Sequence, residues 1–169
     1  MIVVADTGPV NYLIVSGHID LARALYGILL LPPAVHRELL HPRSPAIVRQ
    51  WAMTLPAWAE VRSPQNAPRF TELGPGEREA IALALETKAD FLLIDETDGR
   101  RTAVLNGVPV KGTLGLLEEA AQRNLVDLAA AVGKLKATRI FLAEDIVQGA
   151  LKRHHERQPK READPGIER

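Results

Sequence analysis

Short runs of consecutive apolar residues alternate along the chain with longer segments whose apolar residues recur every three or four positions. The runs predict buried strands at 2–5, 28–31, 59–62, 91–94 and 108–111. The longer segments predict helices at 10–26 (interrupted near 16–18), 33–40, 46–53, 77–88, 99–105, 113–123, 128–136 and 142–155. Strands and helices of these lengths in alternation predict a parallel sheet of four or five strands, covered by helices on both faces.

Length and composition narrow the class of protein. The chain has 169 residues, a length typical of one domain, and only 4% of them are aromatic, so the core must be mainly aliphatic. We expect one domain over 1–155 and a loose polar tail over 156–169. The absence of cysteine fits a reducing cytoplasm, and no apolar run approaches the ~18 residues of a membrane span. The sequence predicts a soluble cytoplasmic protein that does not contact membranes.

Two acidic residues directly follow predicted strands. Asp6 comes after the first strand and Asp95 after the fourth. Ligands of open parallel sheets bind beyond the carboxyl ends of the strands, so a parallel pairing would place both acids at one edge. An aspartate in this position can equally be the cap of the following helix. Each acid alone is therefore an ambiguous signal.

Two glutamates on predicted helices point towards the same edge. At about 100° per residue, Glu77 shares a narrow arc with Ile81, Ala84 and Leu85, whereas Glu79 lies with Glu86 on the opposite, exposed side. Glu38 stands near the inward edge of its helix. A first-turn glutamate can simply complement the helix dipole, and a lone helical glutamate is usually a solvated charge. The combination of four acids from separate segments favours a shared site.

Clustered carboxylates have a chemical requirement of their own. They repel one another and cannot all remain ionised without a cation between them. Oxygen-only ligands favour Mg²⁺ or Mn²⁺. Such ions polarise a phosphate and generate a hydroxide nucleophile, which makes phosphodiester hydrolysis the natural chemistry.

Five segments, in this order, resemble the PIN domain, and specifically small prokaryotic PIN proteins related to VapC-type toxin ribonucleases. They are Val4-Ala5-Asp6-Thr7-Gly8-Pro9, Val35-His36-Arg37-Glu38-Leu39, Gly76-Glu77-Arg78-Glu79-Ala80-Ile81, Leu92-Leu93-Ile94-Asp95-Glu96 and Val110-Lys111-Gly112-Thr113-Leu114-Gly115. The resemblance implies a three-layer α/β/α sandwich and Mg²⁺- or Mn²⁺-dependent cleavage of RNA by an endoribonuclease. It also implies the toxin of a toxin–antitoxin pair or a related RNA-processing nuclease, with a homodimer and an antitoxin protein as expected partners.

The resemblance assigns roles to individual residues. The catalytic and metal-binding acids would be Asp6, Glu38, Glu77 and Asp95, with Thr7 as the hydroxyl that supports the first of them. Glu79 competes with Glu77 for the third position, and Glu96 and Asp98 compete with Asp95 for the fourth. Residues that could contact RNA follow the last two strands: Arg100, Arg101, Lys111 and Thr113.

Three other functions remain possible at this level. A phosphatase of the haloacid-dehalogenase type also has an aspartate after its first strand, but a second aspartate two residues later would be needed where Gly8 stands. A receiver-like phosphoacceptor module normally pairs two acids after the first strand, and only Asp6 is present. A PIN fold used for protein binding alone is the third alternative, and the complete set of acids argues against it.

Overall fold

The computed structural model describes residues 1–66, 69–138 and 143–158. The strands are β1 (Ile2–Ala5), β2 (Ile28–Leu31), β3 (Ala59–Val61), β4 (Phe91–Leu93) and β5 (Val110–Lys111). The helices are α1 (Thr7–Val15), α2 (Asp20–Tyr26), α3 (Pro33–Leu39), α4 (Ala46–Met53), α5 (Pro75–Thr87), α6 (Thr97–Leu105), α7 (Thr113–Gln122), α8 (Leu128–Lys136) and α9 (Glu144–Arg157).

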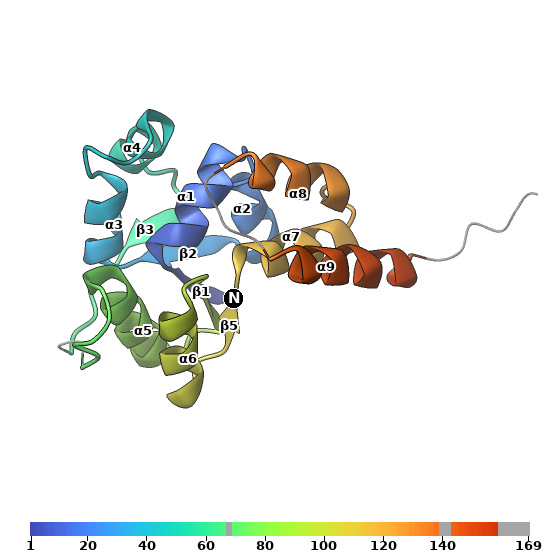
Figure 1. Cartoon of the computed structure of the whole chain (residues 1–169). Coiled ribbons are helices and arrows are strands. Elements are labelled where there is room, and N and C mark those ends of the chain that lie inside the picture. The colour runs from blue at the N-terminus through green and yellow to red at the C-terminus, as the bar shows by residue number, and fades with distance from the viewer. Residues whose placement is uncertain (67–68, 139–142, 159–169) are drawn as a thin grey trace, which may run out of the picture.

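The strands form one sheet in the order β3-β2-β1-β4-β5, and every pair is parallel. Figure 1 shows α5 and α6 on one side of this sheet and α1, α2 and α7 on the other. The prediction of a parallel α/β fold with helices on both faces is therefore confirmed. The order reverses at β1, in the middle of the sheet, because β2 and β3 extend from one side of it and β4 and β5 from the other.

The sheet lies between two apolar cores, because successive side chains of each strand point to opposite faces of the sheet. Val3 and Ala5 of β1 face a large core with α1, α2, α7 and α8, whereas Val4 faces a smaller core with α5. Successive side chains of a strand point to opposite faces, so one apolar run supplies both layers. These cores hold β1 and β4 side by side, which sets the position of the residues that follow them.

Several observed bounds differ from the predicted ones, among them those of the first helix, the last strand and the last helix. The first helix begins at Thr7, directly after Asp6, and ends where Gly17 takes a positive φ of 78°. The last strand covers only Val110–Lys111 because Pro109 has no N–H to donate to β4. The last helix runs from Glu144 to Arg157, so the expected tail begins inside it, and residues 159–169 lie outside the described residues. None of the described helices is long and apolar enough to cross a membrane.

Candidate functional site

The carboxyl edge of β1 and β4 brings two of the predicted acids together. Ala5 of β1 pairs with Leu93 of β4, and the amide of Asp6 donates to the Leu93 carbonyl at 2.9 Å. Asp6 and Asp95 therefore leave neighbouring strands at the same edge. This edge is also where the strand order reverses, the usual place for a ligand in an open parallel sheet.

Asp6 is the most deeply buried of the acids, with only 6% of its surface exposed. Burial raises the pKa of its carboxyl group to about 7, and the backbone amide of Thr7 offsets part of that rise. The negative charges of Glu77, Glu38 and Asp95 each add to the rise. Asp6 stands before α1 but makes no capping hydrogen bond with its side chain. The charges of the other three predicted acids thus all act on Asp6.

Glu38 reaches the edge from α3, where two groups from other segments bind its carboxylate. The Thr7 hydroxyl donates to Oε2, and the backbone amide of Gly76 donates to Oε1 at 3.0 Å. A Cβ atom on Gly76 would stand 2.7 Å from Oε2, closer than real contacts allow. Glycine at the start of α5 therefore permits Glu38 to enter. Thr7, which was expected to support the first acid, contacts the second.

Glu77 lies in the first turn of α5, and its surroundings disfavour a negative charge. Burial raises the pKa of its carboxyl group, the backbone amide of Gly74 offsets part of this, and the charges of Glu96, Glu38 and Asp98 raise it further. A Cβ atom on Gly99 of α6 would stand 3.4 Å from the Glu77 carboxyl carbon. Glu77 therefore faces the other acids, between α5 and α6.

Asp95 is held by the start of α7. Its Oδ1 accepts the backbone amide of Thr113 at 2.8 Å, and its Oδ2 accepts the Thr113 hydroxyl at 2.6 Å. A Cβ atom on Gly112 would stand 2.9 Å from Oδ1. Asp95 thus does cap a helix, but it caps α7 and not α6, the helix that follows it in sequence. This contact also differs from the expectation that Thr113 binds RNA, because Thr113 is fully buried and gives both donors to Asp95.

We predict that Thr113→Val separates the two roles of Asp95. The change removes one hydrogen bond to a charged acceptor, a loss of about 1.5 to 3 kcal/mol in unfolding free energy. If the position of Asp95 matters for activity, RNA cleavage should fall about tenfold in Thr113→Val and stay near wild type in Thr113→Ser. Urea denaturation and initial cleavage rates measure the two effects. Loss of stability with unchanged cleavage would mean that Asp95 serves only as a helix cap.

Glu79 occupies a different environment from the exposed one that was predicted. Its Oε2 accepts the backbone amide of Ala34 at 2.7 Å, and its Oε1 lies 3.7 Å from an Arg37 guanidinium nitrogen. The prediction of an exposed side chain was wrong because α3 packs along this side of α5 and its first turn lacks a capping side chain of its own. Glu79 supplies that cap and is turned to α3.

Three further polar residues lie around the acids. Glu96 and Asp98 are exposed at the start of α6, and their charges raise the pKa of Glu77. Tyr12, which the sequence analysis missed, has its pKa raised by burial and by the charges of Asp95 and Glu96. Nothing in its local sequence marks this position, because only the tertiary packing of α1 brings Tyr12 near these acids.

The basic residues that were expected to bind RNA fall into two groups. Arg100 donates from Nη1 to the Ile94 carbonyl at 2.7 Å, beside Gly112, and Arg101 is exposed on α6. Lys111 forms an ion pair with Glu119, and its ammonium nitrogen lies 4.2 Å from the centre of the Phe91 ring. Phe91 stands two residues back along β4 from Leu93, the partner of Lys111, so Lys111 turns away from the acids.

The four acids suit a hard divalent cation by their donor chemistry, since all would offer carboxylate oxygen. Their side chains are not gathered into a ready cage: within 1–66, 69–138 and 143–158, no three acidic or histidine side chains form a group close enough to hold a metal ion. Glu38 and Asp95 have protein donors on both oxygens, whereas buried Asp6 and half-buried Glu77 have raised pKa values. Asp6 and Glu77 are therefore the acids whose ionised form a bound cation would stabilise most.

Comparison with known proteins agrees with this architecture. Residues 2–156 match the family described as PIN domain (DUF3368). A solved structure, a PilT N-terminus domain protein from the hyperthermophilic archaeon Sulfolobus solfataricus P2, is similar with a TM-score of 0.53 and 18% identity, over 71% of this chain and 93% of that one. A search of curated proteins gave no match.

PIN domains are typically metal-dependent nucleases, which sets aside the phosphatase and receiver alternatives. The family match spans nearly the whole chain, and the chain therefore belongs to the PIN-domain family.

Proposed function

We propose that this protein is a Mg²⁺- or Mn²⁺-dependent endoribonuclease that hydrolyses RNA phosphodiester bonds at the carboxyl edge of β1 and β4. The observation that carries the proposal is the burial of Asp6 among three other acids, which raises its pKa to about 7. A group in this state is costly to keep ionised unless a cation accompanies it. Membership of a family of metal-dependent nucleases supports the same conclusion.

In this proposal Asp6, Glu38, Glu77 and Asp95 hold the metal and Thr7 and Thr113 orient two of them. A bound Mg²⁺ or Mn²⁺ would supply Lewis acidity and lower the pKa of a water nucleophile. Thr7 fixes Glu38 and Thr113 fixes Asp95, so the outer acids are positioned before any ligand arrives. Exposed Glu96 and Asp98 remain alternative ligands for the fourth place.

Arg100 and Arg101 are the proposed contacts to substrate phosphate. Arg100 is anchored through Nη1 to the carbonyl of Ile94, the residue before Asp95, and no other hydrogen bond of its guanidinium group is found among the described residues. An arginine can bind phosphate through two parallel hydrogen bonds. Lys111 is a weaker candidate because Glu119 neutralises it and aromatic rings cover it.

The narrower biological role follows from the resemblance to toxin ribonucleases. We extend the proposal to a toxin of a toxin–antitoxin pair that forms a homodimer and is inhibited by an antitoxin protein. Size-exclusion chromatography with light scattering tests the dimer. Purification of the tagged chain with any protein that binds it, followed by a cleavage assay of the complex and of the free chain, tests inhibition.

The proposal predicts cleavage of a mixed RNA substrate in Mg²⁺ or Mn²⁺ and none in EDTA. Asp6→Asn preserves the size of the side chain but removes its charge, so cleavage should fall on the order of 100-fold or more, equivalent to roughly 3 kcal/mol of transition-state stabilisation. Gel analysis of labelled RNA measures both. Metal-dependent cleavage that survives in Asp6→Asn, at wild-type rate, would place the activity elsewhere or in a contaminant.

A further inference from the structure

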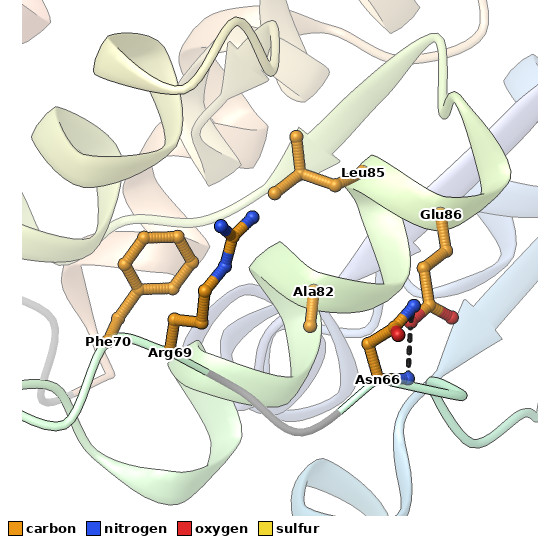
Figure 2. A pocket seen from close by; sticks show the side chains of 6 residues that line it. All are labelled: Asn66, Arg69, Phe70, Ala82, Leu85 and Glu86. Atoms are coloured by element: carbon orange, nitrogen blue, oxygen red, sulfur yellow. Dashed lines mark hydrogen bonds between the residues drawn. The ribbon is translucent and has the colours of Figure 1, made fainter.

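A cavity lies on the outer side of α5, away from the carboxyl edge. Its walls comprise Asn66, Arg69, Phe70, Ala82, Leu85 and Glu86. Figure 2 shows the Arg69 side chain running alongside the Phe70 ring towards Leu85, with Asn66 and Glu86 at the other end. Because α5 rises about 1.5 Å per residue, Ala82 is about 7.5 Å further along the helix than Glu77. The cavity is thus close to the acids but turned to another side of the helix.

The walls combine a flat apolar surface with a free cation. Phe70 is half-buried, and its ring packs with Leu85 against the smaller core. Arg69 is exposed, and within the part of the chain that the structure describes, no side-chain hydrogen bond or ion pair engages its guanidinium group. A ring face beside an unpaired arginine offers one surface for a nucleobase and one donor set for a phosphate.

A second arginine lies on the same side of α5. Arg78, Ala82 and Leu85 fall within about 60° of one another around the helix axis at about 100° per residue. The Nε atom of Arg78 is buried without a hydrogen-bond partner in the described structure. This atom is shielded from solvent and Arg78 is not one of the cavity walls, so Arg69 is the cation that a ligand of the cavity meets.

Glu86 contributes a negative charge to the cavity, but hydrogen bonds hold it at the wall. Its two carboxylate oxygens accept the backbone amides of Gln65 and Asn66 at 2.7 Å each, and Oε1 also accepts the Asn66 side chain at 2.9 Å. These bonds lower the pKa of Glu86 and attach Gln65 and Asn66 to α5. The wall is therefore preformed.

A second basic groove among the described residues is less suited to an anionic ligand. It lies between α7 and α9, and its basic residues are Lys111, Arg123, Arg153 and Arg157. The first three form ion pairs with Glu118 or Glu119. A phosphate at any of these three would have to displace a carboxylate, and the groove also contains both glutamates, whereas Arg69 requires no displacement. The choice between the two surfaces therefore favours the cavity beside α5.

We propose that this cavity binds one nucleotide of a single-stranded RNA whose scissile phosphate lies at the acid cluster. The base packs on Phe70 and Leu85, and a phosphate accepts hydrogen bonds from the exposed guanidinium group of Arg69. This subsite rests on the proposed ribonuclease function, and it adds affinity for substrates long enough to span from the acids to the side of α5. Stacking on an aromatic ring depends little on base identity, so the subsite favours strand length over sequence.

The test is binding of a fluorescent, mixed-sequence single-stranded RNA to the full chain in EDTA, followed by anisotropy. Arg69→Ala should weaken binding about tenfold and reduce the slope of log K against log salt by about 0.7, the value for one lost phosphate contact on a single strand. Phe70→Leu should weaken binding about tenfold with the slope unchanged, and Phe70→Trp should restore it. Arg23→Ala, which removes an exposed arginine of α2 on the opposite side of the sheet, is the matched control and should bind as wild type does.

Two outcomes would overturn the subsite: equal affinity and slope in Arg69→Ala and wild type, or no RNA binding by the wild type. Melting curves show whether each variant is folded, and Phe70→Leu retains an apolar side chain for the core.

The binding and cleavage measurements also distinguish a failure of the subsite from a failure of the proposed nuclease function on which it rests. Metal-dependent cleavage with no effect of Arg69→Ala on binding removes the subsite alone, whereas Arg69-dependent binding with no cleavage in any divalent metal removes the nuclease alone.

Discussion

Glu77→Gln is expected to abolish most metal-dependent RNA cleavage, while Glu79→Gln stays within a few-fold of wild type. The two residues stand two positions apart on α5, but their carboxylates have different neighbours. Glu77 faces the other acids, whose charges raise its pKa, whereas Glu79 caps α3 through the Ala34 amide. Loss of a metal ligand removes several kcal/mol of transition-state stabilisation, on the order of 100-fold or more in rate.

Glutamine is a suitable substitution at both positions because it preserves length and one carbonyl oxygen. At position 79 that oxygen can still accept the Ala34 amide, so α3 and its Glu38 stay in place. Initial cleavage rates at saturating Mn²⁺, with melting curves for both variants, measure the difference. The reverse ranking in two folded variants would mean that Glu79 belongs to the reactive group and that Glu77 is a structural residue.

Asp6→Asn is expected to stabilise the metal-free protein at pH 8 and to remove most of its stabilisation by metal. The folded pKa of Asp6 is raised from 3.8 to about 7, so the folded state holds this proton more tightly than the unfolded state does. Stability therefore falls as pH rises between these values, and the full penalty applies above about pH 7. At about 1.4 kcal/mol per pKa unit, the penalty is roughly 4 kcal/mol. Asparagine carries no charge, so the Asp6→Asn variant does not lose this stability at high pH.

Metal binding should reverse the same penalty in the wild type. A cation that binds only the folded state at a hundredfold excess over its dissociation constant stabilises by about 2.7 kcal/mol, or roughly 5 to 10 °C in melting temperature for a chain of this size. Melting curves at pH 5 and pH 8, in EDTA and in Mn²⁺, give all four comparisons. The explanation fails if wild type and Asp6→Asn show the same pH dependence in EDTA, or if Mn²⁺ shifts both melting temperatures equally.

Local signals in the sequence predicted the elements of the fold well. The helices Ala46–Met53 and Leu128–Lys136 have the predicted bounds, since Pro45 and Asp127 mark their starts. The strands at 2–5 and 28–31 also have the predicted bounds. Apolar runs between prolines, glycines and polar residues depend on neighbours in sequence, so they can be interpreted without the tertiary structure. The same signals predicted parallel pairing, because a helix between two strands requires a crossover.

The acids themselves could be proposed from the sequence, because Asp6 and Asp95 end apolar runs and Glu77 shares a helical arc with Ile81. What binds each acid could not. Glu38 accepts from Gly76, 38 residues away, and Asp95 accepts from Thr113, 18 residues away. Such pairs depend on how helices from different parts of the chain dock on the sheet.

Tertiary packing also decided between near-identical neighbours. Glu77 and Glu79 have similar sequence surroundings, and only the docking of α3 turned Glu79 into a helix cap. Lys111 is the last residue of a strand, a place where a lysine could bind phosphate. Its ammonium group instead contacts Glu119 and the Phe91 ring, away from the carboxyl edge. The sequence by itself therefore predicted the strands, the helices and the acids that we propose to hold a cation. The tertiary structure decided which of them face one another, because hydrogen bonds and charges act through space at distances that sequence separation does not predict.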